Sequence, residues 1–232
     1  MADPVVPEPV EEVAEPVEEV AEHVEALRDE LVDAEVVDSD LVYQGRVWDV
    51  RSDTVRYGDG EIVRQYVDHP GASAIVAMDD DGKVLLIQQY RHPIRHRDWE
   101  IPAGLLDIAG ESPLETAQRE LMEEADLVAA DWRPLVSIFT TPGGNDEVVH
   151  LFLATGLSPV GRAHAREAEE ADIRIEWIPL EDAVTGVLEG RLRNGILATG
   201  VLAAAERLRR AAGAAGSVRQ RAASSGRSPR GD

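Results

Sequence analysis

Residues 104–127, GLLDIAGESPLETAQRELMEEADL, decide the fold because the start of a helix can be read directly from them. Ser112 is a favourable N-cap and Pro113 suits the first helical position. Glu115 follows the cap by three residues and completes a capping box. Apolar residues then recur at helical spacing, which gives the helix a face to bury. We therefore expect a helix over residues 113–125.

Three acidic residues fall within little more than one turn of this helix. Glu120 and Glu124 are four residues apart and project from one face, with Glu123 beside them. Like charges at this spacing destabilise a helix unless a cation compensates. Arg119 is one such cation, and a hard divalent ion such as Mg²⁺, which prefers carboxylate oxygens, is another. A solvated acidic helix face is the alternative, and helical spacing alone does not decide between them.

The whole constellation resembles the Nudix box, G-x5-E-x7-R-E-U-x-E-E-x-G-U, in which U is apolar. The positions that match in register are Glu111, Arg119, Glu120, Leu121, Glu123, Glu124 and Leu127. Six residues rather than five separate Gly104 from Glu111, but this insertion lies in a loop, where insertions are tolerated. Asp126 replaces the final glycine just past the helix end, at a left-handed position that Asp tolerates.

The resemblance implies an α+β fold, the Nudix α/β/α sandwich around a mixed sheet, and metal-assisted hydrolysis of a nucleoside diphosphate linked to another moiety. Other motifs are similar to the ADP-ribose pyrophosphatase branch: WEIPAGLLD before the box, QQYR at 88–91, PGGNDE at 142–147, EEADI at 169–173, and Pro142 fifteen residues after Leu127. That branch hydrolyses ADP-ribose to AMP and ribose 5-phosphate. A broader nucleoside diphosphate sugar pyrophosphatase and a non-catalytic ADP-ribose sensor are alternatives, and the intact acids of the box argue against the sensor.

The resemblance also implies the metal site. Mg²⁺ or Mn²⁺ would be held by the carboxylates of Glu120 and Glu124 and by the backbone carbonyl of Ala103. Glu123 would add a ligand through water, and Arg119 with Glu111 would fix the geometry of the loop and helix. Glu170 would orient or deprotonate the attacking water, or complete the metal site. Two neighbouring acids, Glu167 and Glu169, are alternatives to Glu170, and so is a purely solvated run of charge.

Substrate contacts are implied in the same way, at Trp48, Arg64, Arg91, Glu100, Gly143 and Glu147. Trp48 would stack on adenine, with burial in the core as the alternative. Arg91 would pair with the diphosphate, and Arg64 is a weaker candidate that surface solvation explains equally well. Glu100 and Glu147 match acids that bind the substrate or its terminal ribose.

Composition limits the remaining classes. The 232 residues fit one main domain with extensions. The absence of cysteine excludes disulfide scaffolds and thiol ligands, and a net charge of −22 argues against nucleic acid as a partner. No apolar run approaches the roughly 20 residues of a membrane span, and the N-terminus lacks the features of a signal peptide, so we expect no membrane and a cytoplasmic location.

The chain divides into four segments. Residues 1–40 form an acidic extension with fifteen acids and one base, expected to be disordered, although a partner-docking helix over 17–34 is the alternative. Residues 41–69 are expected to form an antiparallel sheet, residues 70–210 the Nudix domain, and residues 211–232 a disordered basic tail. The branch also implies a domain-swapped homodimer that exchanges residues 42–68. Further strands are expected at 134–140, 147–154 and 173–178, and helices at 180–189 and 194–210.

Overall fold

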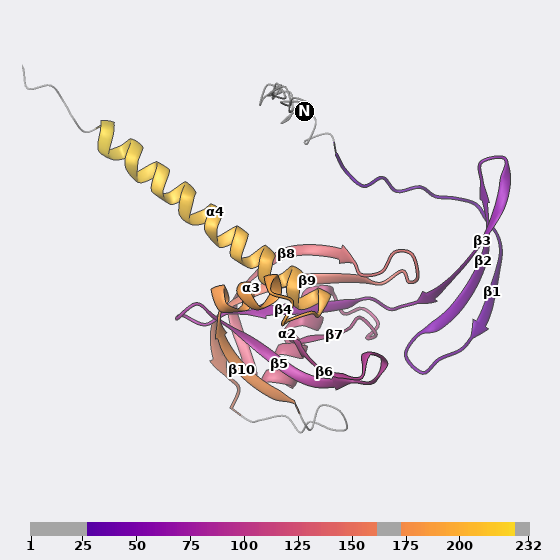
Figure 1. Ribbon diagram of the computed structural model, residues 1–232, viewed down its shortest axis with the longest axis horizontal. Helices are drawn as coiled ribbons and strands as arrows, with labels where there is room; N and C mark the ends of the chain where they lie inside the picture. Colours follow the sequence, from indigo (N-terminus) through magenta and orange to yellow (C-terminus); the bar gives the residue numbers. More distant parts are fainter. Residues whose placement is uncertain (1–26, 162–172, 226–232) are drawn as a thin grey trace, which may run out of the picture.

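The computed structural model describes residues 27–161 and 173–225, and three sheets form its framework (Figure 1). The N-terminal sheet has the order β1-β2-β3, with β1 (Val36–Tyr43), β2 (Asp49–Tyr57) and β3 (Gly60–Asp68). A four-stranded sheet has the order β7-β4-β9-β8, with β7 (Ala103–Leu105), β4 (Ala72–Ala77), β9 (Val148–Pro159) and β8 (Leu127–Phe139). The third has the order β10-β5-β6, with β10 (Arg174–Pro179), β5 (Lys83–Arg91) and β6 (His96–Glu100).

Helices cover both faces of the two central sheets. They are α2 (Pro113–Ala125), α3 (Leu180–Leu188) and α4 (Gly195–Ser225), and η1 (His92–Ile94) is a short 3₁₀ turn. The α2 face packs Leu121 against Ile75, whereas the α4 face packs Leu197 and Val201 against Val76. β4 is buried along its whole length because both of its faces are covered. The pairing of β4 with β9 is parallel and its pairing with β7 is antiparallel, so this sheet is mixed, as expected for the Nudix α+β sandwich.

The prediction for α2 is confirmed in detail. The Ser112 side chain accepts a hydrogen bond from the Glu115 N–H, and the Glu115 side chain accepts one from the Ser112 N–H. Asp126 ends the helix in the left-handed conformation, at φ 55° and ψ 34°. It therefore adopts the backbone conformation that the glycine of the Nudix box would provide.

Segment boundaries differ from the expectation at both ends. β1 begins at Val36, before the expected boundary at residue 41. α4 continues to Ser225, so residues 211–225 are helical where a disordered tail was expected, because alanine and arginine are strong helix formers. The expectations for residues 1–26 and 226–232 lie outside the described residues. Within the described ranges, no helix combines the length and the apolar character needed to cross a bilayer.

The N-terminal sheet, β1–β3, stands away from the rest of the molecule as an arm (Figure 1). Its root is tied to the loop that precedes β9. The Val67 N–H donates to the Gly144 carbonyl at 3.0 Å, and the Asp146 N–H donates to the Val67 carbonyl at 3.3 Å. The arm is therefore fixed at its base while its strands extend beyond the central sheets.

Candidate active site

The four-stranded sheet holds α2 in place through a buried serine. Ser73, on the α2 face of β4, donates from its hydroxyl to the Pro113 carbonyl at 2.7 Å. This bond ties the backbone of the first turn of α2 to β4. The first turn is thereby fixed over β4, and the acidic turns of α2 lie beside β7.

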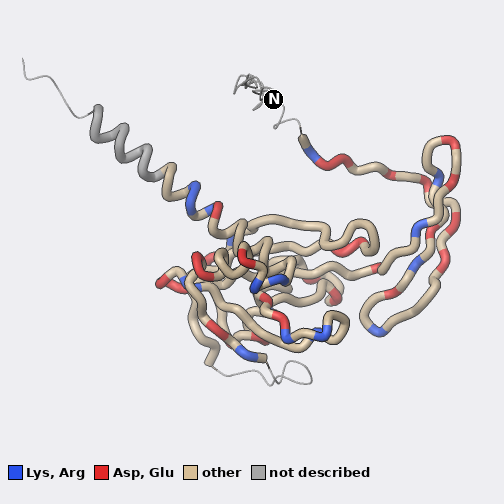
Figure 2. The backbone as a smooth tube through the Cα atoms, in the orientation of Figure 1, with Lys and Arg blue, Asp and Glu red and all other residues tan. Residues whose placement is uncertain are grey.

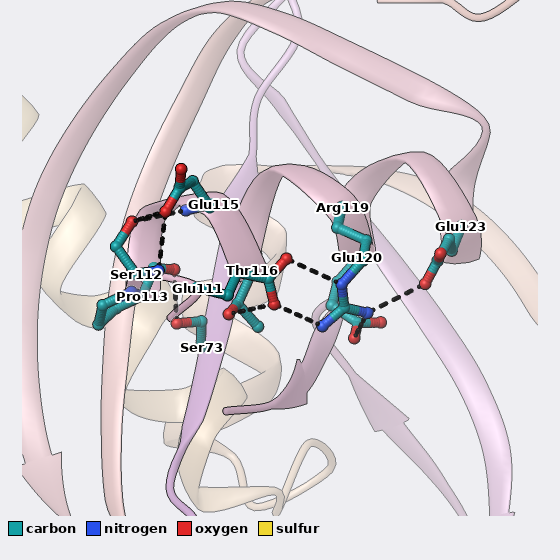
Figure 3. Close-up of polar contacts among 9 residues, drawn as sticks. All are labelled: Ser73, Glu111, Ser112, Pro113, Glu115, Thr116, Arg119, Glu120 and Glu123. Atoms are coloured by element: carbon teal, nitrogen blue, oxygen red, sulfur yellow. Dashed lines mark hydrogen bonds and ion pairs between the residues drawn. The ribbon is translucent and has the colours of Figure 1, made fainter. Parts of the chain in front are cut away.

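Arg119 gathers the acids of the box around one guanidinium (Figure 3). It donates to both carboxylate oxygens of Glu111 at 3.1 Å, to Glu120 at 2.5 Å and to Glu123 at 3.1 Å. Thr116, which is fully buried, also donates to Glu111 at 3.0 Å. The hydrogen bond from Arg119 holds the pKa of Glu111 below its usual range, and the same bond raises the pKa of Arg119. Arg119 therefore offsets the repulsion among the acids and ties the preceding loop to the helix.

Glu120 lies directly against the backbone of Gly104. A Cβ atom placed on Gly104 would be 1.8 Å from the Oε1 atom of Glu120, well inside the sum of atomic radii. A side chain at residue 104 would therefore displace the Glu120 carboxylate. The glycine of the box is required here by close approach, since its backbone carries no positive φ.

Glu124 and the backbone of Ala103 meet at the outer edge of β7. The Ala103 N–H donates to the Glu124 carboxylate at 3.0 Å. Pro102 accepts from the Ile75 N–H of β4, and neighbouring residues of a strand direct their backbone groups to opposite edges. The Ala103 carbonyl consequently faces the same edge as its N–H, towards Glu124 and away from β4.

This donor set suits a hard divalent cation. Two carboxylates, Glu120 and Glu124, and one backbone carbonyl, Ala103, supply only oxygen atoms, which Mg²⁺ and Mn²⁺ prefer. Among the described residues, no group of three or more Asp, Glu or His side chains is arranged to hold a metal by itself. Proteins commonly bind Mg²⁺ through one or two carboxylates and leave the remaining positions to water and substrate phosphates, and this set adds one carbonyl to that arrangement.

Arg91 and Glu100 form a bidentate pair at the end of β5. The guanidinium donates to both carboxylate oxygens at 2.7 Å, and Gln89 donates to the same carboxylate at 3.3 Å. Glu100 is buried, whereas the Arg91 side chain is 43% exposed. Glu100 thus orients Arg91 in this structure, a partnership that the sequence pattern did not indicate.

Trp48 lies outside the core, at the base of the arm. It is 47% exposed and stacks on His69, with ring centroids 5.4 Å apart and ring planes at 27°. The Nε2 atom of His69 lies 3.6 Å from Glu147, which also accepts from the Thr140 hydroxyl at 2.5 Å. Trp48 and Glu147, both predicted substrate contacts, are therefore joined through His69.

Comparison with known proteins gives the family. A model of the NUDIX domain matches residues 67–196, more than half of the chain. The chain belongs to the Nudix family.

This Nudix protein is similar to several proteins over most of their length. An ADP-ribose pyrophosphatase of Mycobacterium tuberculosis is 48% identical over 172 residues, covering 74% of this chain and 83% of the relative. An ADP-ribose pyrophosphatase of Bacillus subtilis is 36% identical, covering 66% and 82% of the two chains. A methanol dehydrogenase activator of Bacillus methanolicus is 35% identical, covering 70% and 88%. A crystal structure described as an ADP compounds hydrolase aligns with a TM-score of 0.63 at 21% identity, covering 78% of this chain and 97% of that one, which supports the fold.

Not every predicted site residue of this Nudix protein joins the cluster at α2. Arg64 is exposed in the middle of β3, where its guanidinium donates to the Val63 carbonyl at 2.9 Å, so it lies in the arm. Gly143 is exposed in the loop before β9. Glu170 and the alternative acids beside it lie outside the described residues. The sequence motifs did not indicate His69 as a site residue. Its position between the end of a strand and Pro70-Gly71 is the one feature of the sequence that distinguishes it.

Proposed function

We propose that this Nudix hydrolase cleaves the diphosphate of ADP-ribose with water to give AMP and ribose 5-phosphate. The observation that carries the proposal is the approach of Glu124 to the Ala103 backbone and of Glu120 to the Gly104 backbone, beside Arg119, in a chain 48% identical to a protein named ADP-ribose pyrophosphatase.

Glu120 and Glu124 of α2, together with the backbone carbonyl of Ala103 in β7, would bind Mg²⁺ or Mn²⁺. When bound, such an ion neutralises charge on phosphoryl oxygens and lowers the pKa of bound water. Arg119 keeps Glu120 in place, and Glu111 and Thr116 keep Arg119 in place. Glu123, half-exposed at the end of this network, would contribute through a water molecule.

Substrate recognition would use residues outside the box. Arg91, oriented by the buried Glu100, would contact the diphosphate, for which a guanidinium is well matched. Trp48 would offer its exposed face to adenine, and Glu147 would accept hydrogen bonds from ribose hydroxyls. Gly143 would allow the backbone of the loop to approach the substrate closely. Glu170 would orient or deprotonate the attacking water.

Arg64 of one chain would contact the substrate bound by a second copy of the chain. We propose a homodimer in which the arm of one protomer packs on its partner, as in a domain-swapped pair, and Arg64 would then reach the partner's substrate. Exposed apolar side chains on all three strands of the arm support this proposal, because a three-stranded sheet without an apolar contact is only marginally stable. Those residues are Val36, Val37, Leu41, Val42, Tyr43, Tyr57 and Val63.

A substrate panel tests the reaction. The purified protein, with Mg²⁺ or Mn²⁺, would be given ADP-ribose, ADP-glucose, GDP-mannose and NADH, and the products would be identified by mass. Preferential release of AMP and ribose 5-phosphate is expected. Similar turnover of several nucleotide sugars would instead identify a broader pyrophosphatase, and tight binding of ADP-ribose without cleavage would identify a sensor.

A matched pair of substitutions tests the role of α2. Glu124→Gln should lower kcat about 1,000-fold, because removing a carboxylate ligand from a catalytic metal costs several kcal/mol of transition-state stabilisation. Glu115→Gln makes the same change at the other end of the helix, in the capping box, and should leave kcat unchanged. Wild-type turnover by Glu124→Gln would overturn the assignment.

A further inference from the structure

We propose that His69 is a positioning residue that fixes the base platform Trp48 and the carboxylate of Glu147 as one unit. The proposal rests on the proposed function, in which those two side chains bind the nucleotide portion of the substrate. The structure places the imidazole of His69 between them, with its side chain only 8% exposed.

The tautomer of His69 follows from its hydrogen bonds. The Gly71 N–H donates to the Nδ1 atom at 3.0 Å, so Nδ1 is an acceptor and carries no proton. The proton of the neutral ring is therefore on Nε2, which lies 3.6 Å from the Oε1 atom of Glu147. The donor side of the ring thus faces the carboxylate, as an orienting contact requires.

The ring also supports Trp48. A stack with centroids 5.4 Å apart and planes at 27° covers one face of the indole. Trp48 as a whole residue is 47% exposed, and we infer that its other face has room for a nucleobase. A planar base stacked there would extend a series of three rings, His69, Trp48 and the base.

The backbone of His69 reinforces the same connection. Its N–H donates to the Asp146 side chain at 2.8 Å, next to Glu147 in sequence. Glu147 is also held from the other side by Thr140. His69 therefore contacts the loop through both its backbone and its ring, while the same ring contacts the arm. Among the residues that the structure describes, His69 contacts Trp48, Gly71, Asp146 and Glu147 and none of the acids of α2, so its loss should affect binding of the nucleotide rather than the chemical step.

Replacement of His69 by alanine tests this inference. His69→Ala should raise KM for ADP-ribose about 10-fold and leave kcat within twofold, since an aromatic platform for a base contributes roughly this much to binding. The affinity for AMP, measured by calorimetry, should fall by a similar factor, whereas competition by ribose 5-phosphate should be unchanged. Trp48→Ala should weaken AMP binding as well. The double variant, His69→Ala with Trp48→Ala, should bind AMP no more weakly than whichever single variant binds it more weakly.

Controls separate positioning from loss of structure. His69→Phe keeps a ring beneath Trp48 and should bind AMP more tightly than His69→Ala, even if both unfold at a lower temperature. His92→Ala removes another histidine that packs on an aromatic ring, Tyr90, and should change neither KM nor AMP affinity. The inference would be overturned by equal AMP affinity in the wild type, His69→Ala and His69→Phe. It would also be overturned if His69→Ala lowered only kcat. AMP binding requires no turnover. A wild-type protein that binds AMP but leaves ADP-ribose intact would therefore contradict the proposed function and leave the inference about His69 standing.

Discussion

Gly104 determines where a metal-binding carboxylate can lie, although it carries no functional group. Gly104→Ala would place a methyl group 1.8 Å from the present position of Glu120 Oε1, so the flexible carboxylate must move aside. We expect kcat to fall about 100-fold, because a displacement of about 1 Å in a reacting geometry has an effect of that size. Steady-state kinetics at saturating Mg²⁺ measure it. Gly60→Ala, at a turn with open space around it, should retain full activity, and an active Gly104→Ala would contradict the expectation.

Glu111 gives the stability of the protein a dependence on pH. Its pKa is lowered from the ordinary value of 4.5, chiefly by the hydrogen bond from Arg119. Ionised Glu111 therefore stabilises the folded state above pH 4.5, and this contribution is lost as the pH falls through the lower pKa of the folded state. Glu111→Gln should lower the melting temperature at pH 7, and the difference from the wild type should shrink below pH 4.5.

Thermal unfolding at a series of pH values measures this effect. Asp59→Asn removes an acid from an exposed turn and should show no comparable pH-dependent difference. The opposite outcome is a melting temperature of Glu111→Gln that stays below that of the wild type by a constant amount, down to the pH at which acid unfolds the protein. That result would indicate that Arg119 does not favour the ionised carboxylate.

At the scale of elements, two of the glycines in α4 have opposite roles. A Cβ atom on Gly200 would lie 2.9 Å from Val76, 3.0 Å from Ile101 and 3.1 Å from Leu151, because the helix packs closely on the sheet there. Gly200→Ala should destabilise the protein by about 1–3 kcal/mol through overpacking. Gly213→Ala, in open space on the same helix, should stabilise it by roughly 0.5–1 kcal/mol through helix propensity. Urea denaturation of both variants compares them, and equal effects would show that α4 is not pressed against the sheet.

Sequence alone predicted those elements whose boundaries depend on local chemistry. The capping box at Ser112 and the left-handed end at Asp126 are local, so both were predictable. The continuation of α4 beyond residue 210 was not predictable in this way, because the weak apolar patterning of residues 211–225 favours disorder while their alanine and arginine content favours a helix. The pairing of Arg91 with Glu100 and the stack of Trp48 on His69 depend on strand register and on the arm, which no local pattern reveals.

At the scale of the whole molecule, the arm is held together by exposed ion pairs as well as by its strands. Acidic and basic residues are interspersed along it (Figure 2), and Arg56 pairs with Glu35 at 2.9 Å and with Glu61 at 3.5 Å. Exposed pairs of this kind contribute at most about 1 kcal/mol each. The apolar surface on both faces of the arm therefore needs a partner, which is the physical basis for the proposed homodimer.

Light scattering after size-exclusion chromatography tests the dimer. The wild type should have twice the 25.3 kDa mass of the chain. Leu41→Asp combined with Val63→Asp introduces a charge on each face of the arm, at residues 49% and 58% exposed, and should give a single chain. Leu188→Asp makes the same kind of change at an exposed residue of α3 and should remain dimeric. A monomeric wild type would contradict the proposal.

The hydrogen bonds at the root of the arm affect how two chains would associate. Val67, His69, Gly144 and Asp146 fix the direction of the arm by hydrogen bonds made within a single chain. Each chain can therefore fix the direction of its own arm before it meets another, while the apolar side chains of the arm stay exposed until the proposed partner covers them. In the proposed homodimer, association would then be a docking of arms whose direction is already set, and it would require no unfolding of the central sheets to reverse. Two differently labelled populations, mixed under native conditions, should exchange subunits at the rate at which the docked arms dissociate.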